Sequence, residues 1–339
     1  MSFASTLRRS ALRFLSLATL AAPLVVASTF AVGCSAPAGD EDVGTGGTSA
    51  AASVGDSVLG GDVTEDTLTM VLRPKEKAID YGSPAQLALS IQDGVVGHTM
   101  VELRCQKSDK REKGYYLLTG QTGGATMEED VRKNGWGLGI IWRSYDGYLQ
   151  DDARVRGNVE DKAKEGALSF VRYRISPSMC ERLASFADEY KKNEDYKKYG
   201  LVNRPRMREG AGCTGFGMGF LEVAGFVEKD YETAWTKTLH VQSSLIGDPD
   251  NGKKVSVLDL GTSFRWAREG EAQREATYWE PNFIHKWIVE RATKIARGDE
   301  EAPAGAKVVG HEKAKGLEFD RRTVEAPSEA IFLVDKTPE

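Results

Sequence analysis

The first 33 residues have the three parts of a cleavable export signal, which limits the part of the chain that can fold as a domain. Positive charge comes first, at Arg8, Arg9 and Arg13, and an apolar run without any charged residue follows over 15–32. That run is near the lower length limit for a membrane-spanning helix and is rich in Ala, Ser and Thr. We therefore predict that residues 1–33 are removed; a transmembrane anchor and ordinary secretion are the alternatives.

The signal ends in small residues directly before Cys34, and this ending resembles the lipobox of bacterial lipoproteins. Ala31 stands where that motif usually has Leu. The resemblance implies that Cys34 is lipidated, and two or more acyl chains hold a protein stably on a bilayer. We expect a lipid-anchored, periplasm-facing protein of the cell envelope. Because Ser35 and not Asp follows the cysteine, the outer membrane is favoured over the inner one.

Differences in composition divide the rest of the chain into three segments. Residues 34–63 are dominated by Gly, Ser, Ala and Thr, which cannot bury enough apolar surface to become ordered, so we predict a flexible tether. Residues 64–298 are long enough for one large domain. Residues 299–339 are charged and contain Gly, Pro and Ala, which predicts a polar C-terminal extension.

Charge and motif content exclude several classes of function. The formal net charge of −5 argues against a nucleic-acid partner, which would require a basic face. The sequence contains four histidines, and no two have metal-ligand spacing. No phosphate-binding or dinucleotide-binding glycine motif occurs. We therefore expect neither a cofactor nor a metal.

Three cysteines remain after Cys34 is set aside: Cys105, Cys180 and Cys213. In an oxidising compartment two of them can pair. Cys105 ends a strand-like run and Cys180 lies in a helix-like run, so they form either a disulfide or two buried thiols. Cys213 differs because glycines surround it.

Hydrophobic patterning predicts an α+β domain with a largely antiparallel sheet packed against helices. The expected helices begin at Ser176-Pro177, at Gly212-Cys213 and at Glu280-Pro281, where capping residues precede apolar stripes. The expected strands are Leu68–Leu72, Gln86–Ile91, Val95–Cys105, Tyr115–Thr119, Gly139–Tyr145, Ser169–Ile175, Val255–Leu260 and an edge strand at Ala330–Val334.

The segment around Cys213 is the strongest candidate for chemistry. A helix N-terminus stabilises a thiolate, and its N–H groups can hold an oxyanion during acyl transfer. Each glycine inside a helix costs about 1 kcal/mol relative to Ala. The glycines therefore indicate either close packing of the helix on a sheet or access of a substrate to the thiol; they are Gly210, Gly212, Gly215, Gly217 and Gly219.

Gly97-His98 in an early strand, followed much later by Gly212-Cys213-Thr214-Gly215-Phe216, resembles the circularly permuted papain-like families. These are relatives of NlpC-type cell-wall peptidases and of the lecithin:retinol acyltransferase group. In such proteins the histidine strand precedes the cysteine helix, as it does here. The resemblance covers about Val95 to Gly225 and implies a permuted papain-like fold.

The resemblance also implies roles for particular residues. Cys213 would be the nucleophile and His98 the general base. A third polar residue that orients the imidazole would come from the neighbouring strand, where Thr119 and Gln121 are candidates and Gln121 is preferred. Glu102 shares a strand face with His98 but lies about 13 Å along the strand, too far for a direct hydrogen bond.

Three hypotheses for function follow. The first is a thiol hydrolase, an amidase or peptidase that cleaves amide or ester bonds in peptidoglycan peptides or in lipid. The second is a non-catalytic envelope lipoprotein that uses the same fold for binding or structure. The third is an acyltransferase that uses the same Cys213–His98 dyad.

Overall fold

The computed structural model describes residues 57–61, 64–91, 96–108 and 111–334. The predicted signal, the lipidation site Cys34 and most of the predicted tether lie outside the described residues. Within the described ranges, no helix is both long enough and apolar enough to cross a membrane.

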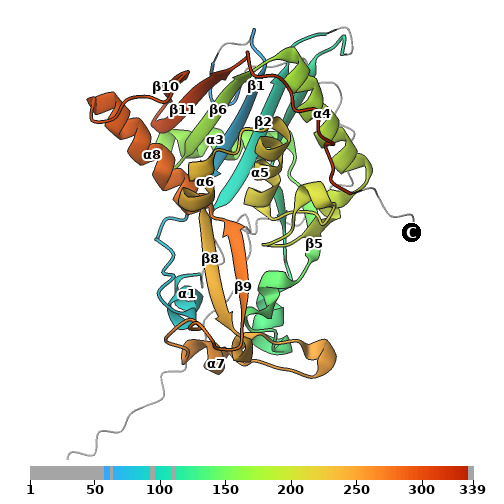
Figure 1. The fold of residues 1–339 in the computed structure, drawn as a ribbon, viewed down its shortest axis with the longest axis vertical. Coiled ribbons are helices and arrows are strands. Elements are labelled where there is room, and N and C mark those ends of the chain that lie inside the picture. The colour runs from blue at the N-terminus through green and yellow to red at the C-terminus, as the bar shows by residue number, and fades with distance from the viewer. Residues whose placement is uncertain (1–56, 62–63, 92–95, 109–110, 335–339) are drawn as a thin grey trace, which may run out of the picture.

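A six-stranded sheet forms the upper part of the molecule, with strand order β10-β11-β6-β1-β2-β3 (Figure 1). All neighbours are antiparallel except β11 and β6, which run parallel. The predicted α+β class with a largely antiparallel sheet is therefore confirmed. The strands are β1 (Thr67–Arg73), β2 (His98–Cys105), β3 (Tyr115–Thr119), β6 (Ser169–Ile175), β10 (Ala306–His311) and β11 (Ala314–Arg321).

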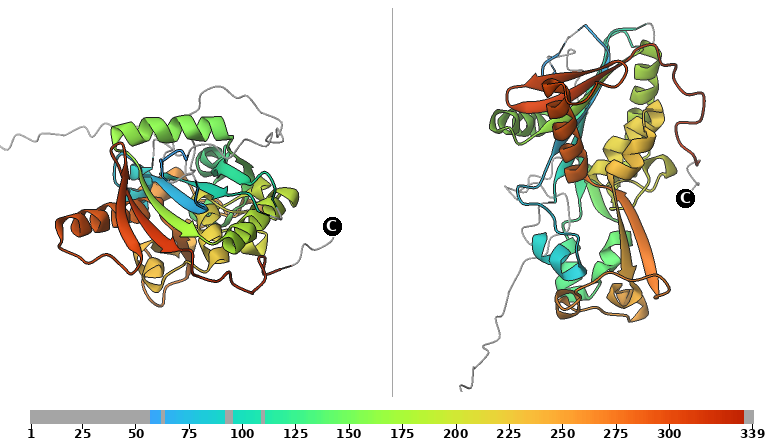
Figure 2. Two further views of the ribbon diagram at one scale, coloured as in Figure 1. Left: turned by 90° about the horizontal axis from the view of Figure 1, so that it is seen from above. Right: turned by 60° about the vertical axis from the view of Figure 1, so that its left-hand side comes forward.

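Helices cover both faces of this sheet. On one face lie α4 (Pro177–Lys192), α5 (Cys213–Ala224) and α8 (Pro281–Arg297), and on the other lies α3 (Asp152–Glu165) (Figure 2). Strand β1 shows the alternation that this arrangement requires. Met70 and Leu72 pack with the first set of helices, whereas Val71 packs with Val155 and Val159 of α3.

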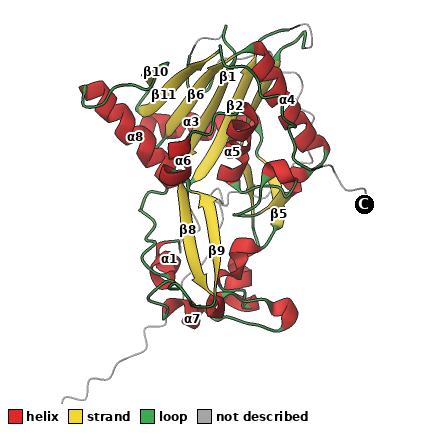
Figure 3. Cartoon of the chain, viewed as in Figure 1, coloured by secondary structure: helices red, strands yellow, loops and turns green. Residues whose placement is uncertain are grey.

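A smaller lobe lies below the sheet and has its own apolar cluster (Figure 3). The antiparallel hairpin of β8 (Thr236–Gln242) and β9 (Gln273–Trp279) runs from the sheet into this lobe. Its other elements are α1 (Pro84–Ser90), α2 (Met127–Glu129), α7 (Val257–Gly261) and a 3₁₀ helix at Leu138–Trp142. The short helix α6 (Lys229–Ala234) precedes β8, and a small sheet joins β4 (Gln121–Gly123), β5 (Tyr145–Leu149) and β7 (Lys198–Tyr199).

The predicted helix starts are confirmed by their caps. Ser176 accepts a hydrogen bond from the Met179 N–H at the start of α4, and Glu280 does the same for the Phe283 N–H at the start of α8. Helix α5 begins at Cys213 and ends at Ala224. The capping residue Gly225 follows, and its φ of 68° is the left-handed conformation that glycine adopts without strain.

Four predicted strands are wrong. Some of these segments are helical instead, and local hydrogen bonds at their starts account for the difference. The run expected as Gln86–Ile91 is helix α1, which Ser83 caps. The run expected as Val255–Leu260 contains α7, which begins with a capping box of Ser256 and Asp259. Most of Gly139–Tyr145 belongs to the 3₁₀ helix, and Ala330–Val334 forms no strand.

Cys105 and Cys180 form a disulfide, with their Cα atoms 5.7 Å apart. This bond joins the end of β2 to α4, between positions 75 residues apart in the sequence. It decides between the two alternatives that the sequence left open for this pair.

Both predicted domain boundaries need correction. Strands β10 and β11 extend the main sheet, so residues 306–321 belong to the domain and are not a separate extension. At the other end, Ser57 lies against the sheet, where its hydroxyl donates to Glu102 Oε2 at 2.6 Å. The N–H of Val58 donates to Glu102 Oε1 at 2.9 Å. The ordered part of the chain therefore begins before residue 64.

Glu102 is fully buried and also accepts a hydrogen bond from the Tyr116 hydroxyl. Glu102→Ala should therefore lower the free energy of unfolding by about 2–4 kcal/mol, because it leaves several buried donors without an acceptor. Limited proteolysis should then cleave near residue 57, where the wild type resists. The matched variant Glu160→Ala, at an exposed site on α3, should change stability by less than about 0.5 kcal/mol. Equal free energies of unfolding for Glu102→Ala and Glu160→Ala would contradict the stabilising role of the Glu102 hydrogen bonds.

Candidate functional site

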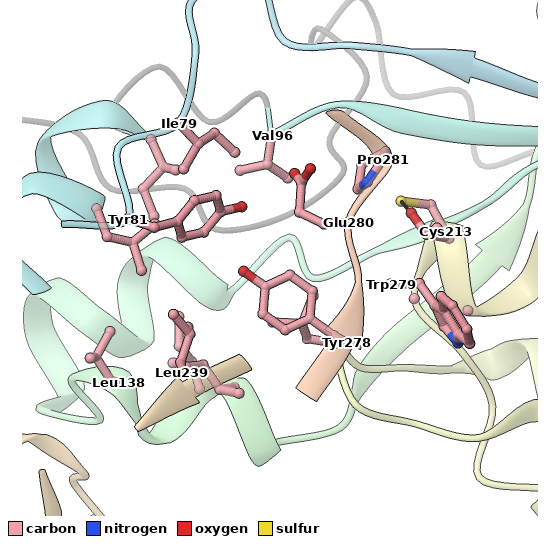
Figure 4. Close-up of a pocket in the computed structure, with 18 of the residues that line it drawn as sticks. Ile79, Tyr81, Val96, Leu138, Cys213, Leu239, Tyr278, Trp279, Glu280 and Pro281 are labelled. Atoms are coloured by element: carbon pink, nitrogen blue, oxygen red, sulfur yellow. Dashed lines mark hydrogen bonds between the residues drawn. The ribbon is translucent and has the colours of Figure 1, made fainter. Parts of the chain in front are cut away.

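An apolar cavity lies where the small lobe meets the N-termini of α5 and α8 (Figure 4). Its volume is about 80 Å³, and it is partly open to solvent. Most of its wall is aliphatic or aromatic, from α1, the 3₁₀ helix, β8 and β9, and includes Ile79, Leu87, Ile91, Val96, Leu138, Ile140, Ile141, Leu201, Leu239 and Trp279.

Glu280 is the acidic group in this wall, and it is only 1% exposed. Its Oε2 accepts from the Phe283 N–H at 2.6 Å and its Oε1 from Asn282 Nδ2 at 2.5 Å. Burial raises the pKa of the Glu280 carboxyl, although these hydrogen bonds oppose the rise. The same carboxyl therefore caps α8 and contributes a polar group to the cavity.

Two tyrosines share this part of the cavity with Glu280. Burial, together with the nearby Tyr278 and Glu280, raises the pKa of Tyr81 far above its usual range. Burial and Glu280 likewise raise the pKa of Tyr278. Both hydroxyls therefore stay neutral, and Figure 4 shows them directed into the region where the Glu280 carboxyl lies. Three groups able to hydrogen bond thus converge within an otherwise apolar space.

Cys213 lies in the wall of the cavity, as the first residue of α5. Its Sγ is 3.7 Å from Thr214 Oγ1, which in turn lies 3.1 Å from Thr99 Oγ1 of β2. These contacts connect the start of α5 to β2.

Close packing on the sheet explains one glycine of α5, Gly217. A Cβ at Gly217 would lie 2.9 Å from Thr99 Cγ2 and 3.2 Å from Met70 Sδ. A side chain at this position would therefore push the helix away from β1 and β2. Of the two explanations that the sequence allowed, the structure favours packing for Gly217, while Gly212 and Gly215 line the cavity.

The structure does not bring His98 and Cys213 together. Side chains alternate along β2, so Thr99 faces α5 while His98 faces the opposite side of the sheet, where α3 lies. The His98 Nε2 is 2.7 Å from Gln150 Oε1, beside the start of α3. The dyad implied by the papain-like resemblance is therefore absent from this arrangement.

Gln121 does not orient the imidazole either. It is fully buried, and its Nε2 donates to the carbonyl oxygens of Tyr196 and Lys198, while its Oε1 accepts from the Tyr190 hydroxyl at 2.6 Å. These bonds connect β4, α4 and the segment before α5. Gln150 contacts His98 instead, and no sequence motif pointed to it.

His98 has the surroundings of a structural histidine. Burial, together with charge repulsion from Arg73 and Arg154, lowers the pKa of His98 to about 4. Its Nδ1 is buried and has no hydrogen-bond partner among the described residues. The ring is therefore neutral at physiological pH, with the Nε2–H donated to Gln150.

This burial makes stability depend on pH. The unfolded chain binds a proton at His98 below pH 6.5, whereas the folded chain does so only near pH 4. The unfolded state thus holds more protons within this window, and stability falls as the pH drops through it. One pKa unit corresponds to about 1.36 kcal/mol. Between pH 6.5 and pH 4, the free energy of unfolding of the wild type, measured by denaturant titration, should therefore fall by about 3 kcal/mol more than that of His98→Gln. His240→Gln, at an exposed histidine, should keep the wild-type dependence of unfolding free energy on pH. If His98→Gln also kept that dependence, His98 would not be the group responsible for it.

Sequence reasoning missed the polar groups of the cavity. Glu280 was identified only as part of a helix start, and Tyr81 and Tyr278 lie in segments without a motif. They come together because the β8–β9 hairpin ends at Trp279, directly before α8, and because residues 79–91 fold back onto that hairpin. Hydrophobic periodicity contains no signal for such a long-range contact.

No protein-family model, curated protein or solved structure matches this chain.

Proposed function

We propose that this protein is a non-catalytic envelope lipoprotein that binds the apolar part of a small molecule in the cavity beside Cys213. The apolar wall of that cavity carries the proposal, because such walls with a few convergent polar groups are typical of ligand sites. Aliphatic and aromatic side chains from α1, β8 and the 3₁₀ helix would surround the ligand. Burial of its apolar surface would supply the main driving force.

The two catalytic hypotheses have less support. The position of Cys213 at the start of α5 and in the cavity wall fits thiol chemistry. A hydrolase or acyltransferase would also need a base beside the sulfur, however, and His98 faces the other side of β2. The aliphatic lining further disfavours peptidoglycan peptides, which would need several polar partners in the wall.

The papain-like relationship remains part of the proposal. It is supported by the order of the histidine strand and the cysteine helix, and by the packing of α5 against β2. We propose that the protein keeps such a scaffold without its dyad.

The cellular location is also proposed. The charge and apolar pattern of residues 1–33 and the small residues before Cys34 support a lipid anchor facing the periplasm, with the outer membrane favoured. The Cys105–Cys180 disulfide is consistent with an oxidising compartment. The lipid bilayer would be a partner through the acyl chains.

Binding of the neutral apolar dye N-phenyl-1-naphthylamine tests the proposed cavity. The full chain should enhance its fluorescence with one site per chain. Leu201→Trp should weaken binding at least about 10-fold, equivalent to about 1.4 kcal/mol, because Leu201 lines the cavity and the larger ring would fill it.

Val202→Trp is the matched control, since this neighbour lies outside the lining and should bind the dye within about twofold of wild type. Absence of saturable binding to the wild type would contradict the proposed function. Equal weakening by both variants would place the dye elsewhere.

A further inference from the structure

We propose that the ligand of this cavity is a cationic amphiphile, an alkyl or aryl ammonium whose charged end lies against Glu280, Tyr81 and Tyr278. This inference rests on the proposed function, since it concerns the polar end of the molecule that the cavity binds. It adds the chemical class of that end.

The charges around the cavity favour a cation. Among the described residues that line it, none is a lysine, arginine or histidine, and Glu280 is its acidic side chain. A buried carboxylate is costly unless an opposite charge or hydrogen bonds compensate it. A ligand ammonium would supply that charge, whereas a carboxylate or phosphate head would add a like charge to the same space.

The hydrogen bonds of Glu280 determine how a ligand would contact it. Its carboxyl accepts from the Phe283 N–H, from the side chain and the N–H of Asn282, and from the Tyr81 hydroxyl. Tyr81 also lines the cavity, so a ligand ammonium would take the place of its hydroxyl at the carboxyl. An ammonium has three donors and no acceptor, which suits an acceptor-rich end.

Aromatic rings strengthen the case. Tyr81, Tyr278 and Trp279 all line the cavity, and the faces of such rings attract organic cations. The ring of Tyr81 already has a cation near it in this structure, since Lys237 Nζ lies 5.0 Å from the ring centroid. A carboxyl group among aromatic rings is the combination that ammonium recognition uses.

The remainder of the wall suits the ligand's other end. Leu138 of the 3₁₀ helix and Leu239 of β8 are almost fully buried and lie beyond the polar group (Figure 4). Contact with them would bury the alkyl or aryl portion, whereas a small ion such as ammonium itself would leave this surface uncovered. We therefore expect affinity to require both ends of the molecule.

Three probes with the same chain separate the contributions of the two ends: decylammonium, decanol and decanoate. Each is titrated by calorimetry into the full chain at pH 7 and below its micelle concentration. Decylammonium should bind at least about 10-fold more tightly than decanol, and decanoate should bind weakest. Glu280→Gln should reduce decylammonium affinity to the decanol level and leave decanol within about twofold, because Gln still offers an acceptor to the Phe283 N–H.

Glu275→Gln is the matched control, because it removes the same charge from an exposed site on β9 and should keep the preference for decylammonium. Equal binding of all three probes to the wild type, or tightest binding of decanoate, would overturn the inference and leave the proposed cavity function standing. Failure of decanol and decylammonium alike to bind would overturn both. The wild-type probe series does not depend on whether Glu280→Gln folds.

Discussion

The contact between the first turn of α5 and β2 determines what this fold can do. Thr214 lies 3.1 Å from Thr99, oxygen to oxygen, and Gly217 leaves no room for a side chain between the helix and the sheet. Because β2 alternates its side chains, this contact places Cys213 at the cavity and directs His98 to the other face. The alternation of side chains along β2 thus places His98 and Cys213, which the sequence motif paired, on opposite sides of the sheet.

Glu280 connects the fold to the site in a second way. Its carboxyl caps α8, which packs on the main sheet, and the same group lies in the wall of the cavity. Burial raises the pKa of this carboxyl by more than its hydrogen bonds lower it. A ligand that contacts Glu280 would therefore also contact the helix that joins the small lobe to the sheet.

Local signals predicted much of the fold but little of the site. Strands β1, β2, β3 and β6 and the starts of α4, α5 and α8 followed from alternation and capping. Helices α1 and α7 did not, because their caps at Ser83 and Ser256 outweighed short apolar runs that equally suit strands. The face to which His98 points depends on packing partners that are distant in sequence. The same holds for the cavity, whose wall combines residues from Ile79 to Pro281.

The most direct test is a methyl-resolved NMR titration of the full chain with decanol. Binding in the cavity predicts saturable shifts of the Leu87, Leu138 and Leu239 methyl signals, with Val155 and Val159 on the opposite side of the sheet unchanged. Shifts confined to Val155 and Val159, or no saturable shift at any of these methyls, would contradict the account.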